Sequence, residues 1–156
     1  MNIWNNSSTD SHPKHAVSGN GTVLLVDDEP LVRVMTGAVL TAMGWSVINV
    51  SSGEEAVQTL KLMRERGASV DLVILDLILP SGISGLDTVR LLREIQPGVR
   101  ILACSGFFGD EMGSSCLDLG FNATLSKPFT AEDLAQAVYK CTHTLESSKA
   151  PAGASA

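Results

Sequence analysis

The chain has 156 residues, which is enough for one domain with a buried core. Its hydrophobic fraction of 44% and charged fraction of 18% are typical of a soluble globular protein, and no apolar run reaches the ~18 residues of a membrane helix. The formal net charge of −6 argues against nonspecific nucleic-acid binding, which needs clustered Lys and Arg.

The two ends of the chain differ in composition from its middle. Residues 1–20 are rich in Asn, Ser and His and have no periodicity, which indicates a disordered tail without an export signal. Residues 147–156 indicate a second flexible tail. The predicted domain therefore covers residues 21–146, and a cytoplasmic location is expected. Three cysteines at unrelated spacings fit neither a disulfide framework nor a metal site and are expected to fill the core: Cys104, Cys116 and Cys141.

The first part of this domain predicts two strand–helix units. Thr22–Val26 is a short apolar run typical of a strand, and Pro30–Met43 has apolar residues at helical spacing with proline at its start. A second strand starts near residue 46. Ser52–Glu55 then resembles a capping box, which predicts a helix from this point to about Arg66.

The second part predicts three more units. Its apolar runs indicate strands at Val70–Leu75, Val99–Cys104 and Phe121–Ser126. A helix is predicted over Gly85–Gln96, and a weaker one around Asp110–Leu119, where glycine and serine lower the helix propensity. Thr130, with an acidic residue three positions later, is expected to cap a fifth helix with a clear apolar stripe.

Five strands that alternate with five helices predict an α/β fold, a doubly wound (βα)5 sandwich around a five-stranded parallel sheet. The first, third and fourth strands are almost entirely apolar, as expected for strands that helices cover on both faces. Ligands bind to such sheets outside the carboxyl ends of the strands.

Four of the apolar runs end next to residues that can do chemistry. In chain order these residues are Asp27 with Asp28, Asp76, Ser105 and Lys127. Because the carboxyl ends of parallel strands lie along one edge of a sheet, we expect these side chains to lie together. Close carboxylates repel one another and need a positive partner, and hard oxygen ligands favour Mg²⁺.

The cluster fits phosphorylation of a carboxylate. Asp76 would attack a phosphoryl group, Mg²⁺ and Lys127 would neutralise charge on its oxygens, and Ser105 would bind one of these oxygens. The new phosphate charge would draw Ser105 and Lys127 toward it and shift the loops that they anchor.

Four motifs, in order, resemble the receiver domain of bacterial response regulators: Val26-Asp-Asp-Glu-Pro30, Asp76-Leu-Ile-Leu-Pro80 with Gly85, Ser105-Gly106, and Lys127-Pro-Phe-Thr130. The resemblance covers residues 21–146. It implies the flavodoxin-like strand order 2-1-3-4-5.

The resemblance also implies a role for each matching residue. Asp76 would be the phosphoacceptor, and Asp27, Asp28 and Asp76 would bind Mg²⁺ together with the backbone carbonyl of Ile78. Asp28 would be the more direct ligand of the acidic pair. Ser105 would be the switch hydroxyl. Lys127 would be the invariant-type lysine of the receiver family. The implied partner is a sensor histidine kinase or a His-containing phosphotransfer protein.

Three positions depart from the usual receiver pattern. The loop at Ser81–Gly85 is one residue longer than is common and resembles receivers attached to hybrid kinases. Thr124 stands where many receivers have a switch aromatic, so coupling is expected to run through Phe107, Phe108 or the fourth helix. Ile78 is apolar where a polar side chain would orient an attacking water, which predicts slow self-dephosphorylation.

The leading expectation is a stand-alone receiver. It would be a module that is not an enzyme, has no output domain after the fifth helix, and controls a protein partner through the face formed by the fourth helix, fifth strand and fifth helix. A monomer or weak phosphorylation-dependent dimer is expected. Alternatives are a phosphorelay intermediate, a receiver excised from a hybrid kinase and, remotely, a phosphohydrolase of the haloacid dehalogenase type. That type has a second Asp two residues after its nucleophile, where this chain has Ile78.

Overall fold

The computed structural model describes residues 21–106 and 118–143. Within them the strands are β1 (Thr22–Val26), β2 (Ser46–Val50), β3 (Leu72–Asp76), β4 (Arg100–Ser105) and β5 (Ala123–Ser126). The helices are α1 (Pro30–Ala42), α2 (Gly53–Glu65), α3 (Gly85–Ile95) and α5 (Ala131–His143). Residues 110–117 of the helix predicted around Asp110–Leu119 lie outside the described residues. Both predicted tails lie outside them as well. None of the described helices has the length and apolar character needed to cross a bilayer.

The strands form one parallel sheet in the order β2-β1-β3-β4-β5, which confirms the predicted doubly wound topology. β1 pairs with β2 and β3, so the strand order reverses beside it. This reversal places the ends of β1 and β3 next to each other, at the edge where such folds bind ligands.

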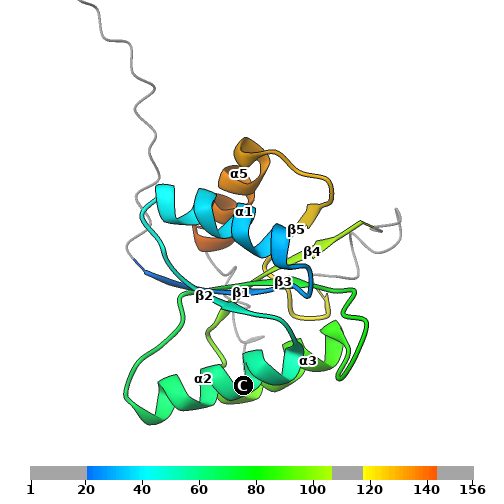
Figure 1. Ribbon diagram of the computed structural model, residues 1–156. Coiled ribbons are helices and arrows are strands. Elements are labelled where there is room, and N and C mark those ends of the chain that lie inside the picture. The colour runs from blue at the N-terminus through cyan, green and yellow to red at the C-terminus, as the bar shows by residue number, and fades with distance from the viewer. Residues whose placement is uncertain (1–20, 107–117, 144–156) are drawn as a thin grey trace, which may run out of the picture.

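Helices cover both faces of the sheet (Figure 1). One core cluster lies between the sheet and helices α2 and α3, and the other lies on the side of α1 and α5. Successive residues of β1 alternate between them: Leu24 belongs to the first core and Val23 and Leu25 to the second. All five residues of β3 are buried, because this central strand is covered on both faces.

Three strands begin later than their apolar runs predict, and side-chain hydrogen bonds lie at the start of two of them. The backbone carbonyl of Val70 accepts a hydrogen bond from the Gln96 side chain (2.8 Å), and β3 starts at Leu72. The side chain of Asn122 accepts a hydrogen bond from the amide of Ile101 (2.8 Å), and β5 starts one residue after it. β4 likewise begins and ends one residue later than predicted.

The predicted helix starts are confirmed in detail. The hydroxyl of Ser52 accepts a hydrogen bond from the amide of Glu55 at the start of α2. At the start of α5, the Thr130 hydroxyl accepts from the Asp133 amide (3.1 Å), and the Asp133 carboxylate accepts from the Thr130 amide (2.8 Å). These contacts satisfy backbone groups that a helix end leaves free.

Candidate functional site

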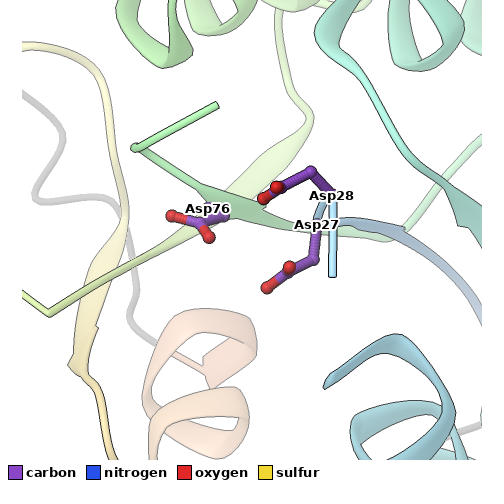
Figure 2. Close-up of side chains that lie close together, drawn as sticks. All are labelled: Asp27, Asp28 and Asp76. Atoms are coloured by element: carbon purple, nitrogen blue, oxygen red, sulfur yellow. The ribbon is translucent and has the colours of Figure 1, made fainter. Parts of the chain in front are cut away.

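The carboxyl edge of the sheet brings together the residues that end the apolar runs. Asp27 follows β1 and Asp76 ends β3, so these neighbouring strands carry both side chains to the same edge of the sheet (Figure 2). Asp27 is 3% exposed and Asp76 is 6% exposed. Such burial is unusual for carboxylates and needs compensating partners.

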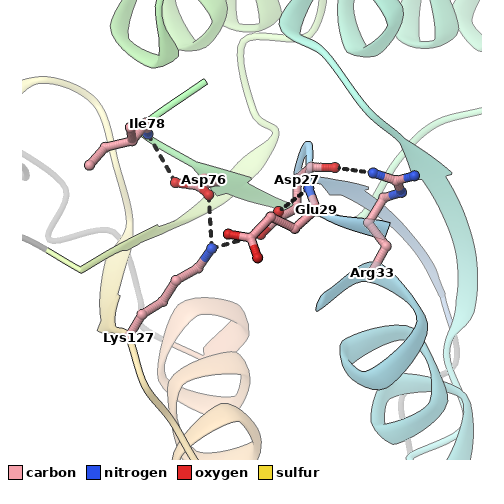
Figure 3. Close-up of polar contacts among 6 residues, drawn as sticks. All are labelled: Asp27, Glu29, Arg33, Asp76, Ile78 and Lys127. Carbon is pink, nitrogen blue, oxygen red and sulfur yellow. Dashed lines mark hydrogen bonds and ion pairs between the residues drawn. The ribbon is translucent and has the colours of Figure 1, made fainter. Parts of the chain in front are cut away.

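Lys127 is the cationic partner of both carboxylates (Figure 3). Its Nζ lies 2.7 Å from Oδ2 of Asp27 and 2.8 Å from Oδ2 of Asp76. Burial works against the charged form of this ammonium, but the hydrogen bonds and charges of the two aspartates outweigh it and raise the pKa of Lys127 above its usual range. The lysine is therefore held charged between the two carboxylates. The Lys127-Pro128 bond that follows is cis.

Backbone hydrogen bonds fix how the chain leaves the sheet at this edge. The amide of Leu77 donates to the carbonyl of Cys104, and the amide of Lys127 donates to the carbonyl of Ser105, each at 2.9 Å. These bonds prolong the strand ladders by one step beyond Asp76 and beyond β5. The side chains of Asp76 and Lys127 are consequently held by rigid strands rather than by free loops.

The second oxygen of each buried carboxylate is also bonded. Oδ1 of Asp76 accepts a hydrogen bond from the amide of Ile78, and Oδ1 of Asp27 accepts one from the amide of Glu29, each at 2.9 Å (Figure 3). Both bonds come from an amide two residues further along the chain. Each aspartate thus orients the turn that follows it.

Asp28 completes the acidic group. Its carboxylate oxygen and those of Asp27 and Asp76 all lie within 4.8 Å of one another. Asp28 is half-buried, and its carboxylate has no hydrogen bond or ion pair within residues 21–106 and 118–143. Three carboxylates against one ammonium leave a formal charge of −2, so the donor set and the charge both fit a divalent, oxygen-seeking cation such as Mg²⁺.

The other predicted residues lie around this centre. Ser105 is buried at the end of β4, beside the strand of Asp76. Ile78 directs its amide at Asp76, while its side chain is 55% exposed. Thr124 is exposed on β5. Phe107 and Phe108 lie outside the described residues.

Sequence reasoning did not identify Arg33 as part of the site. Nη1 of Arg33 donates to the backbone carbonyl of Asp27 at 2.5 Å and so anchors the turn that bears the acidic pair (Figure 3). Its position on α1, six residues after Asp27, gives the only sequence signal. An arginine one turn into a helix is too common to be singled out without coordinates.

Comparison with known proteins agrees with this geometry. A family model described as the response regulator receiver domain matches residues 23–139. The sensor kinase CckA of Brucella abortus is 34% identical over 78% of this chain and 12% of its own length. The chemotaxis protein CheY of Thermotoga maritima is 28% identical over 76% of this chain and 94% of its own length.

A solved structure extends the comparison to the metal. It is the receiver domain of a sensor histidine kinase from Pseudomonas aeruginosa with a magnesium ion coordinated in its active-site cleft. It matches 80% of this chain and 98% of its own with 26% identity and a TM-score of 0.68. The first curated relatives are longer proteins, of whose length this chain spans 12%, 46% and 31%.

Proposed function

Because the chain belongs to the family of response regulator receiver domains, we propose that it accepts a phosphoryl group on Asp76 from a phosphohistidine of a partner protein. The observation that carries this proposal is the pairing of Asp76 and Asp27 with one lysine ammonium, beside a third carboxylate that has no partner among the described residues. The phosphorylated domain would act as a signalling module and not as an enzyme with a separate substrate.

Asp27, Asp28 and Asp76 would hold Mg²⁺, together with the backbone carbonyl of Ile78. When bound, the ion would neutralise charge on the oxygens of the phosphoryl group. The oxygen-only donor set and the formal charge of −2 support this assignment. Within the described part of the chain, the Asp28 carboxylate has no contact that metal binding would have to break, which supports Asp28 as the more direct ligand of the pair.

The transfer itself requires positioning by the residues of this chain. One carboxylate oxygen of Asp76 would attack the phosphorus, the P–N bond would break, and its electron pair would stay on the imidazole of the donor. Lys127 lies within hydrogen-bond distance of the Asp76 carboxylate and would move its contact to a phosphoryl oxygen. Ser105, on the neighbouring strand, would donate its hydroxyl to a second phosphoryl oxygen.

A protein donor has an apolar surface available next to the acidic site. α1 starts at Pro30, directly after the turn of Asp27 and Glu29, and exposes three large apolar side chains at helical spacing. These are Leu31, Val34 and Met35, with 69%, 68% and 62% of their surface exposed. A protein that brings phosphohistidine to Asp76 must cover the start of α1, so we assign this face to the kinase or phosphotransfer partner.

The output side of the proposal is a protein effector that recognises the phosphorylated domain. The coverage of 94% of a CheY protein supports a stand-alone receiver, and the match inside a sensor kinase supports the hybrid-kinase alternative. A shallow groove lined by Thr124, Ser126, Pro128, Gln136 and Lys140 runs between β5 and α5 and supports binding of the effector there. A phosphorelay intermediate would instead pass the phosphoryl group on to a histidine of a phosphotransfer protein.

The proposal is tested by labelling with radioactive acetyl phosphate in the presence and absence of Mg²⁺. We expect Mg²⁺-dependent labelling of the wild type and none of Asp76→Asn. Glu65→Ala, an exposed carboxylate change at the end of α2, serves as a control that keeps its label. Equal labelling of wild type and Asp76→Asn would contradict the proposal. Transfer of label from the wild type to an added His phosphotransfer protein would favour the relay alternative.

A further inference from the structure

The loop between β3 and α3, residues 77–84, follows the proposed phosphoacceptor directly. Its first residues are tied to the sheet, because Leu77 donates to Cys104 and Ile78 donates to Asp76. Its last residue, Ser84, caps α3 by accepting a hydrogen bond from the Asp87 amide (3.1 Å). The middle of the loop needs a separate anchor if Ile78 is to keep a fixed orientation.

Glu54, in the first turn of α2, supplies that anchor. Its Oε1 accepts a hydrogen bond of 2.7 Å from the amide of Ile83. Among residues 21–106 and 118–143, no other hydrogen bond joins residues 79–83 to another element of the fold. The contact spans 29 positions of sequence, and neither motif nor periodicity indicates it.

The backbone around this contact is shaped to receive a carboxylate. Gly82 has a φ of +78°, a conformation that favours glycine. A Cβ atom at Gly82 would lie 2.2 Å from Oε1 of Glu54 and 2.5 Å from its Oε2. The carboxylate therefore sits directly on the backbone of Gly82, and a side chain there would expel it.

Two further close approaches make the loop a compact unit. A Cβ at Gly53 would lie 2.2 Å from Oγ1 of Thr88, so the start of α2 packs tightly against α3. A Cβ at Gly85 would lie 2.7 Å from the carbonyl oxygen of Leu77, so the start of α3 rests on the chain beside Asp76. A shift of the loop at Ile83 would thus reach Leu77 and Ile78 through backbone contacts.

We infer that Glu54 is a positioning residue, which holds the loop through Ile83 so that the Ile78 carbonyl faces the acidic group and Mg²⁺ binds tightly. This inference rests on the proposed function, because it takes the Ile78 carbonyl as a ligand. Glu54 itself lies on α2 and is outside the group of carboxylates that would hold the ion. Its effect is on the affinity for the ion through the geometry of the loop.

The test uses the unphosphorylated full chain, with Mg²⁺ binding followed by backbone amide chemical shifts and with hydrogen exchange of the Ile83 amide. Glu54→Ala removes the acceptor, and we expect about a three- to tenfold weaker affinity for Mg²⁺ and faster exchange at Ile83, since outer contacts of metal sites act on this scale or above it. Glu54→Gln removes the charge but keeps an Oε1 acceptor, and we expect it to bind within about twofold of the wild type. Glu65→Ala removes a charge from the other end of α2 and should change neither quantity.

The results separate the inference from the function on which it rests. A wild type that binds no Mg²⁺ would overturn the proposed metal site and this inference with it. Normal Mg²⁺ affinity in Glu54→Ala, while the wild type binds the ion, would overturn the inference alone. Equal weakening by Glu54→Ala and Glu54→Gln would identify a simple charge effect and also overturn it. Unchanged exchange protection of Val138 in α5 confirms that each variant is folded.

Discussion

Lys127 has an electrostatic role that no other described residue shares, because its ammonium contacts two buried carboxylates from other strands. Removing one partner of a buried ion pair leaves uncompensated charge in a poorly solvated site. The side chain of Lys127 is 21% exposed, so water relieves part of this penalty. The residue therefore links the stability of the fold to the chemistry of the site.

We predict that Lys127→Met lowers the free energy of unfolding by about 1–3 kcal/mol without divalent cations, below the range for a fully buried pair. Added Mg²⁺ should restore more stability to this variant than to the wild type, because three carboxylates then lack a cation. Urea unfolding with and without Mg²⁺ measures both effects. Lys61→Met on the exposed surface of α2 is the control, and an equal loss in both variants would refute the prediction.

The buried thiols of Cys104 and Cys141 predict how the stability of the fold depends on pH. Burial raises the pKa of each thiol to about 12, so both stay protonated in the folded protein. The unfolded chain loses these protons near pH ~8.5, and the free energy of unfolding should therefore fall as the pH rises from there toward 12.

The same shift makes both thiols unreactive in the native state. In a Cys116→Ser background, a thiol reagent at pH ~8 should label Cys104 and Cys141 only after unfolding. Mass spectrometry of peptides identifies each labelled residue. Labelling of either cysteine in the folded protein at the rate of a free thiol would contradict the burial on which the prediction depends.

At the scale of elements, the junction between β3 and α3 carries a steric demand that backbone atoms impose. Gly85→Ala would place a Cβ 2.7 Å from the carbonyl oxygen and 2.8 Å from the Cα of Leu77, and these backbone atoms cannot rotate away. We predict a loss of about 1–3 kcal/mol in the free energy of unfolding, as for other overpacked sites. Urea denaturation measures it.

Gly98→Ala is the matched control for this change. No atom of the described residues lies within 4 Å of a Cβ at Gly98, and the φ of Gly98 does not favour glycine. Its effect should stay within about 0.5 kcal/mol. A Gly85→Ala variant as stable as Gly98→Ala would show that the start of α3 has room to move away from Leu77.

The same elements show why some features follow from sequence and others do not. The apolar run Thr22–Val26 matches β1 residue for residue, because a strand buried on both faces has a local signature. The side chains of Gln96 and Asn122, which are bonded at the starts of β3 and β5, contact residues far away in sequence, and a local pattern does not reveal such contacts. The Glu54 contact with Ile83 is long-range in the same sense.

At the scale of the whole molecule, the strand order turns separate motifs into one site. Lys127 and Asp27 are 100 positions apart in sequence, and parallel strands of one sheet bring their side chains into contact. The topology could be predicted because each strand–helix unit allows few arrangements. The pairing of both carboxylates with one ammonium is a matter of side-chain packing, and it required coordinates.

The central claim is that Asp76 is the phosphoacceptor of this receiver domain. After phosphorylation with acetyl phosphate and Mg²⁺, borohydride reduces an aspartyl phosphate to homoserine, and mass spectrometry of peptides then locates it. We predict homoserine at position 76 alone, and none when Mg²⁺ is omitted. Homoserine at position 27 or 28, or a stable label that borohydride leaves on a histidine, would contradict the account.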